Sequence, residues 1–124
     1  MRYVLLIYGA ESAFDSLPPA QMEAVMGEFG TFTDGIVKSG HYKAGEQLEN
    51  VAKAASIRYR NGRLDAVDGP FAETKEQLGG FYLIDAKDMS EAKDMSEAKA
   101  IAARIPAVKW GTIEVRPVVP MDGM

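Results

Sequence analysis

The sequence predicts an α+β fold with an antiparallel sheet, in which two β-α-β units are joined by an inserted β-hairpin. The chain has 124 residues, which is enough for a single domain spanning 1–124 with its own core. Strand-like runs flank two stretches with helical spacing of apolar residues. Asn61-Gly62 between two alternating runs is the strongest short signal of a hairpin. This order predicts helices on one face of the sheet.

The first half of the chain contains one strand and one long helix. Tyr3 to Tyr8 is apolar at every position, so both faces of this strand need burial. A loop over 10–17 leads to Pro18-Pro19, where proline suits a helix start, and Gly40 suits the helix end. Three glycines inside this helix each cost about 1 kcal/mol against alanine, which indicates close packing or room left beside the helix. They are Gly27, Gly30 and Gly35.

The second half supplies the remaining strands and a second helix. That helix ends near Arg104, because Pro106 stops it, and Pro117 places the last strand at or near a sheet edge. The complete order, β-α-β, hairpin, β-α-β, is the ferredoxin-like split pattern. The expected strands are Tyr42–Leu48, Ala55–Arg60, Arg63–Asp68, Gly80–Asp85 and Thr112–Val119.

Two strands predict a partner for the sheet. Both faces of Tyr3–Tyr8 and of Phe81–Ile84 are apolar, yet two helices cover one face only. Monomers rarely expose an apolar patch of more than a few hundred Å². We therefore expect a homodimer that packs sheet against sheet.

A six-residue segment occurs twice in succession, as Lys87–Ala92 and Lys93–Ala98. Each copy offers an aspartate as N-cap with a glutamate three positions on. Only the second copy suits the helix that follows, since Met95 and Ala98 share one face with later apolar residues. We expect the first copy to form a protruding loop or a partly helical bulge.

Composition excludes several classes of protein. Zero cysteine rules out disulfides and thiolate chemistry, and one histidine makes a zinc site improbable, so we expect neither metal nor cofactor. A net charge of −4 and a pI near 5.0 argue against nucleic-acid binding. The apolar run at the N-terminus is too short and too aromatic to predict a signal peptide, and no apolar stretch reaches the length of a membrane span. We expect a cytoplasmic protein without membrane contact.

Asp68 is the main candidate for chemistry. Hairpin pairing across Asn61-Gly62 places Asp68 on one face with Ile57, Tyr59 and Leu64. On the other face Arg58 lies opposite Asp65, where we expect an ion pair. A carboxylate at the end of an apolar face is either buried with partners or lines a pocket mouth. Alternatively, Asp68 accepts backbone N–H bonds within its own turn. The two roles are compatible.

Other charged residues are weaker candidates. Glu73, Lys75 and Glu76 follow Asp68 closely enough to bind a polar ligand or relay protons, but such clusters are commonly solvated. His41 suits a general base, although a satisfied helix-end donor is the simpler role. Trp110 is most simply a packing residue.

The stretch from Asp68-Gly69-Pro70-Phe71 to Gly80-Phe81-Tyr82 strongly resembles the YCII-related domain family, in particular its DGPF subgroup. The likeness extends over nearly the whole chain, through Tyr3–Gly9, Ala44-Gly45-Glu46, Ala103–Pro106 and Glu114–Pro117. It implies a dimeric α/β barrel of ferredoxin-like subunits with a polar pocket in each subunit. Members of this bacterial group are often encoded beside extracytoplasmic-function sigma factors.

The chain departs from the family at two points. Some YCII-related proteins carry a His–Asp pair with the histidine on the first helix, whereas His41 lies beyond that helix. The dyad chemistry therefore does not transfer, and the doubled segment is also unusual.

We expect a homodimer that binds a small polar molecule, with Asp68 as base or ligand anchor in acid–base chemistry. The alternative is a non-catalytic regulatory module acting through protein contacts, linked to a sigma-factor system. The expected ligand-binding residues are Asp68, Gly69, Pro70, Glu73, Lys75, Tyr8 and His41.

Overall fold

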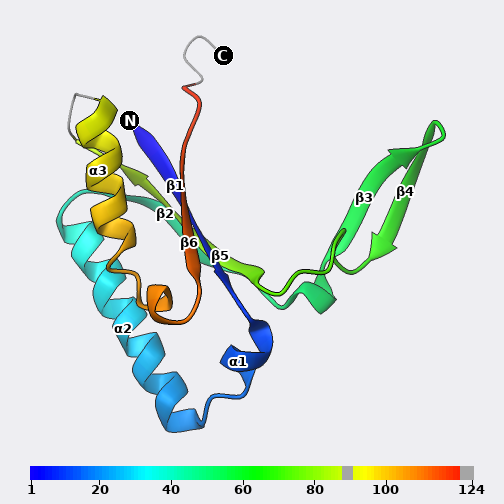
Figure 1. The fold of residues 1–124 in the computed structure, drawn as a ribbon, viewed down its shortest axis with the longest axis horizontal. Coiled ribbons are helices and arrows are strands. Elements are labelled where there is room, and N and C mark those ends of the chain that lie inside the picture. Colours follow the sequence, from blue (N-terminus) through cyan, green and yellow to red (C-terminus); the bar gives the residue numbers. More distant parts are fainter. Residues whose placement is uncertain (88–90, 121–124) are drawn as a thin grey trace.

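The structure, a computed structural model, describes residues 1–87 and 91–120. It confirms the α+β class, with antiparallel sheets and three α-helices (Figure 1). In chain order the elements are β1 (Arg2–Gly9), α1 (Glu11–Asp15), α2 (Pro19–Lys38), β2 (Tyr42–Gln47), η1 (Val51–Lys53), β3 (Ala55–Arg60), β4 (Arg63–Asp68), β5 (Gln77–Asp85), α3 (Glu91–Ala102), η2 (Pro106–Lys109) and β6 (Thr112–Pro117). Among the described residues, no helix is both long and apolar enough to cross a membrane.

The main sheet has four strands in the order β2-β5-β1-β6, and every neighbouring pair is antiparallel. β1 is an inner strand, with Leu5 opposite Tyr82 of β5 and Val115 of β6. Because side chains alternate along a strand, Tyr3 and Leu5 are buried on one face of the sheet.

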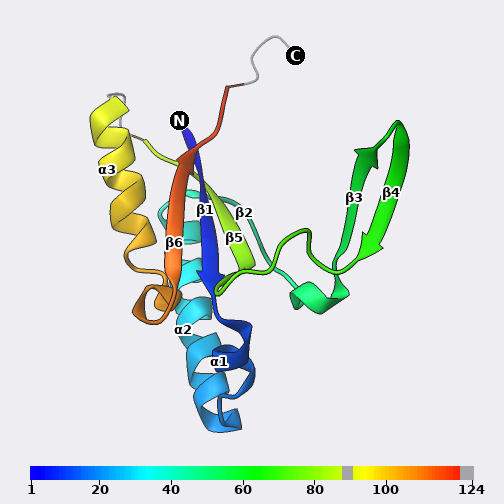
Figure 2. The same cartoon turned by 45° about the vertical axis from the view of Figure 1, so that its right-hand side comes forward.

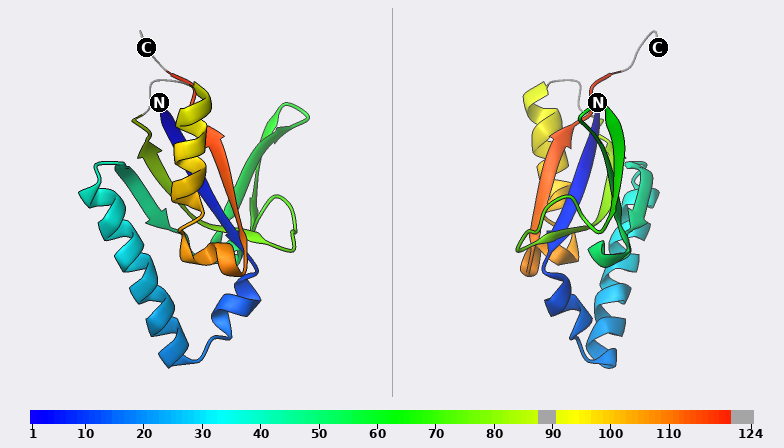
Figure 3. Two further views of the ribbon diagram at one scale, coloured as in Figure 1. Left: turned by 60° about the vertical axis from the view of Figure 1, so that its left-hand side comes forward. Right: turned by 90° about the vertical axis from the view of Figure 1, so that its right-hand side faces the viewer.

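The core lies between that face and two helices, α2 and α3 (Figure 3). Phe32 of α2 packs edge-on against Tyr82, with 5.2 Å between ring centroids. The other face of the sheet carries half-buried apolar residues, Val4, Leu6, Phe81 and Leu83, and no helix of the described residues lies over it. Both faces of β1 are apolar, but α2 and α3 cover only one of them.

Several local predictions are confirmed. α2 starts at Pro19, and Gly40 adopts φ +81° just beyond its end. The hairpin pairs in the expected register, with Tyr59 opposite Leu64 and Ala55 opposite Asp68.

Two elements differ from the prediction. Residues 11–15 form α1 instead of a loop, and its N-cap residue, Ala10, offers no side-chain capping bond, so the sequence carries no helix-start signal there. β5 begins at Gln77 rather than at Gly80. Its early part is glycine-rich because β2 passes very close, and a Cβ on Gly80 would lie 2.8 Å from the Glu46 carbonyl oxygen.

The second copy of the repeat lies inside α3, where Ala98 is fully buried and Met95 packs against the core, as expected. α3 begins at Glu91, within the first copy, so Asp94 is not the N-cap. It is instead a buried carboxylate, 3.4 Å from the N-terminal ammonium of Met1. The loop or bulge expected for the first copy falls largely on residues 88–90, outside the described residues.

The β3–β4 hairpin extends away from the main sheet (Figures 1 and 2). Its two strands pair only with each other among the described strands. The face that carries Ile57, Tyr59 and Leu64 is apolar, as the sequence indicates, but it is exposed, with each of these side chains at least two-thirds accessible. Asp65 faces Arg58 in the register as predicted, but its ion pair is with Arg60, at 3.6 Å between Nε and Oδ2.

Candidate functional site

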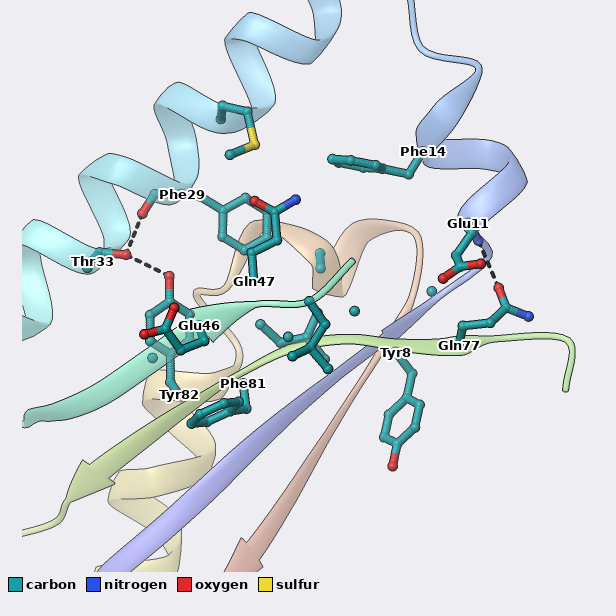
Figure 4. A pocket seen from close by; sticks show the side chains of 18 of the residues that line it. Tyr8, Glu11, Phe14, Phe29, Thr33, Glu46, Gln47, Gln77, Phe81 and Tyr82 are labelled. Carbon is teal, nitrogen blue, oxygen red and sulfur yellow. Dashed lines mark hydrogen bonds between the residues drawn. The ribbon is translucent and has the colours of Figure 1, made fainter. Parts of the chain in front are cut away.

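A pocket of about 430 Å³ opens between α2 and the end of the main sheet, with α1 at its side (Figure 4). Its walls come from separate parts of the chain: the end of β1, α1, the middle of α2, β2, the start of β5, and the 107–110 turn. Aromatic rings dominate these walls, among them Phe14, Phe29, Tyr82 and Trp110. A volume in this range suits a small organic ligand.

Helix α2 leaves room for this pocket at a glycine. Met26, Phe29, Gly30 and Thr33 line the pocket at helical spacing, so they share one face of α2. A Cβ built on Gly30 meets no atom within 4 Å. The sequence left two explanations for glycine in this helix, close packing or room beside the helix. At Gly30 the second explanation applies.

Glu11 is held in the wall by the side chain of Gln77 and the backbone of Val51. Its N–H donates to Gln77 Oε1 at 2.9 Å, and its carboxylate Oε2 accepts the N–H of Val51 at 2.9 Å. Gln77 in turn donates to the Thr74 carbonyl oxygen. The second half of the DGPF-like stretch thus shapes the pocket by fixing the start of α1.

At the other end of the pocket, two hydroxyl groups form a chain (Figure 4). Thr33 Oγ1 donates to the Phe29 carbonyl oxygen at 2.8 Å and lies 2.6 Å from the Tyr82 hydroxyl. Because Thr33 has one hydroxyl hydrogen and a carbonyl only accepts, Tyr82 donates to Thr33. Burial raises the pKa of Tyr82 above its usual value, so the phenol stays protonated and does not serve as a base.

Tyr82→Phe tests this hydroxyl chain through stability. We expect a loss of about 1 kcal/mol at pH 7 from the missing hydrogen bond. Above about pH 10 an unfolded tyrosine releases its proton while Tyr82 keeps its own, so the native state holds more protons and stability falls with rising pH. In Tyr82→Phe the free energy of unfolding should therefore decrease less between pH 7 and pH 11 than it does in the wild type. Urea unfolding at a series of pH values measures this decrease. Tyr59→Phe, at an exposed site, should leave it unchanged; equal profiles for both variants would contradict the assignment.

The residues predicted from sequence occupy different places. Tyr8 lines the pocket, although its ring points away from Phe14 and Phe29 (Figure 4). Asp68 ends β4 on the hairpin, where it is exposed, and its carboxylate makes no hydrogen bond or ion pair in the described part of the chain. The Asx-type bond within its own turn is therefore not formed. Neither Asp68 nor its neighbours Gly69, Pro70, Glu73 and Lys75 line this pocket.

His41 lies outside the pocket, between α2 and α3. Its Nδ1 is 2.6 Å from Ser39 Oγ, and its Nε2 is 3.4 Å from Glu97 Oε2. Its backbone N–H donates to the Ile36 carbonyl oxygen and so satisfies the end of α2. These contacts join the two helices, which agrees with the simpler helix-end role.

Sequence reasoning missed several pocket residues. Trp110, expected to serve packing alone, is 40% exposed and lines the pocket. Glu11 and Phe14 lie on the short α1, which had no sequence signal. Gly30 was the available clue, because a glycine at an apolar helical stripe indicates space beside the helix.

Fold and pocket together define a small α+β protein with a ligand-sized cavity between its long helix and its sheet. Residues 1–122 match the YCII-related domain, and the chain belongs to this family. It is also 37% identical over 91 residues to an uncharacterized protein of Rhizobium meliloti, an alignment that covers 73% of each chain.

Proposed function

We propose that this protein binds a small organic molecule with an aromatic or apolar body in the pocket beside α2. The pocket carries the proposal: it is preformed, of suitable volume, and combines aromatic walls with a few fixed polar groups. Glu11, Thr33 and Tyr82 are each held by hydrogen bonds to other segments of the chain. The wall chemistry supports a ligand less polar than the sequence suggested.

The alternative is a regulatory module that acts through protein contacts, linked to an extracytoplasmic-function sigma factor. Such a module has no need of fixed polar groups inside a cavity. The hydrogen-bonded pocket therefore favours ligand binding. The cytoplasmic location and the DGPF subgroup remain part of the proposal.

The proposal includes a homodimer of ferredoxin-like subunits that forms an α/β barrel. The strand order β2-β5-β1-β6 and the placement of both helices on one face support the ferredoxin-like assignment. The helix-free face with Leu6 and Phe81 supports sheet-to-sheet packing against a second copy.

The exposed hairpin gives Asp68 a place in this dimer. Isolated two-stranded hairpins are marginal in water, and the apolar face of this one has no cover within its own chain. A second copy would supply that cover. Asp68, with Gly69, Pro70, Glu73 and Lys75, then binds ligand, or acts as an acid–base group, at the interface between copies.

Blocking the pocket at Gly30 tests ligand binding. Phenylalanine at this position projects into the pocket, so Gly30→Phe should weaken binding of a neutral aromatic probe, 2-phenylethanol, at least tenfold. The matched control is Gly35→Phe: five residues on, this glycine faces away from the pocket side of α2, and its Cβ position is equally open. The intrinsic fluorescence of Trp110, which lines the pocket, reports binding.

The wild type and Gly35→Phe should bind the probe with the same dissociation constant, in the millimolar range that suits a fragment of this size. Circular dichroism checks that both variants fold. Equal binding by Gly30→Phe and Gly35→Phe would show that this pocket is not the site.

A further inference from the structure

The charge of the pocket restricts what it can bind. Two glutamates, Glu11 and Glu46, are its charged lining residues, and no lysine, arginine or histidine in the described part of the chain lines it. Neither carboxylate is in an ion pair with a described residue. An anionic ligand would face these carboxylates with no cation on the pocket wall.

Glu11 is the better placed of the two. It is half-buried, and the Val51 N–H fixes Oε2, which leaves Oε1 without a donor among the residues that the structure describes. Figure 4 shows its carboxylate at the α1 end of the pocket beside Gln77. Glu46 is exposed on the edge strand β2, so water screens its charge more strongly.

The hydroxyl groups add to the same preference. The hydroxyl groups of Thr33 and Tyr82 both donate hydrogen bonds to protein oxygens. The Tyr82 oxygen can therefore only accept a hydrogen bond from a ligand. A ligand rich in N–H donors is the complement of these acceptors. Aromatic faces such as those of Phe14 and Phe29 also attract a cation through their ring quadrupoles.

From these observations we infer that the ligand is an organic cation, an amine with an aromatic or apolar body whose ammonium group bonds to Glu11. This inference rests on the proposed function and names its ligand class. The ammonium supplies three donors, and the rings of the pocket enclose the hydrocarbon part.

Three probes of nearly equal size test the charge preference in the intact protein. They are 2-phenylethylamine, a cation at pH 7, neutral 2-phenylethanol and anionic phenylacetate. We expect the amine to bind at least tenfold more tightly than the alcohol, and phenylacetate to bind most weakly. Titration calorimetry and Trp110 fluorescence measure the dissociation constants.

Substitutions then locate the carboxylate. Glu11→Gln keeps the shape of the side chain and an oxygen for the Val51 N–H. It should therefore weaken binding of the amine at least fivefold and leave the dissociation constant of the alcohol unchanged. Glu46→Gln should have a smaller effect in the same direction. The control Asp34→Asn removes the same charge from an exposed residue of α2, paired with Lys38 at 2.8 Å outside the pocket, and should change nothing.

The outcomes separate the two proposals. If the alcohol or phenylacetate binds as tightly as the amine, the cation inference fails while the pocket stands. Tight amine binding that Glu11→Gln leaves unchanged, or that Asp34→Asn or Glu46→Gln weakens as much as Glu11→Gln does, overturns the role of Glu11. If no probe binds, the proposed function itself fails.

Discussion

Gly111→Ala should destabilise the fold by about 2–4 kcal/mol, because a methyl group has no room where β6 begins. A Cβ at this position would lie 2.1 Å from the Tyr8 carbonyl oxygen and 3.3 Å from Gly9 Cα. Both neighbours are backbone atoms of the inner strand β1, so the strands themselves must separate. Chemical denaturation monitored by circular dichroism measures the change in unfolding free energy.

Gly35→Ala is the matched control, at a glycine whose Cβ position is open within 4 Å. Alanine there should be neutral or stabilise α2 by up to about 1 kcal/mol, since alanine is the better helix former. A Gly111→Ala protein within 0.5 kcal/mol of wild type would mean that β1 and β6 adjust to the methyl group.

Leu6→Arg should convert a dimer into a monomer. Leu6 lies on the helix-free face, opposite Phe81 and Glu114 in the two neighbouring strands. Packed against a second copy, an arginine here would bury an added charge in the interface, because the neighbouring carboxylate of Glu114 is already paired with Arg116. In a monomer the same side chain extends into water at little cost.

Light scattering at 10 µM should give twice the chain mass of 13.5 kDa for wild type and the single-chain mass for Leu6→Arg. Val37→Arg, an equal substitution at an exposed residue of α2, should remain dimeric. A wild-type protein with the mass of one chain would refute the dimer.

Local signals in the sequence were sufficient for much of the fold. The Asn61-Gly62 turn determined the whole β3–β4 register, because a two-residue turn leaves one way to pair the strands. Proline and glycine marked both ends of α2. The conformation of α1 depends instead on distant groups, Gln77 and Val51, and no pattern within residues 11–15 indicates them.

The candidate site was harder to predict, because its wall is assembled from distant segments. Strand alternation correctly puts Asp68 on one face with Ile57 and Tyr59, but burial of that face also requires that the hairpin packs within its own chain. The hairpin stands apart, so the same face is exposed and Asp68 with it. The alternation of side chains along a strand shows which residues share a face. It does not show which part of the protein packs on that face, because this depends on tertiary structure.

The position of β1 inside the sheet has a consequence for how the protein folds. This strand is synthesised before its partners β5 and β6, which follow only after α2, β2 and the β3–β4 hairpin. Pairings of such long sequence separation are slow to form. The apolar β1 must therefore remain unpaired at least until β5 has been synthesised, and during that interval it is a natural target for chaperones.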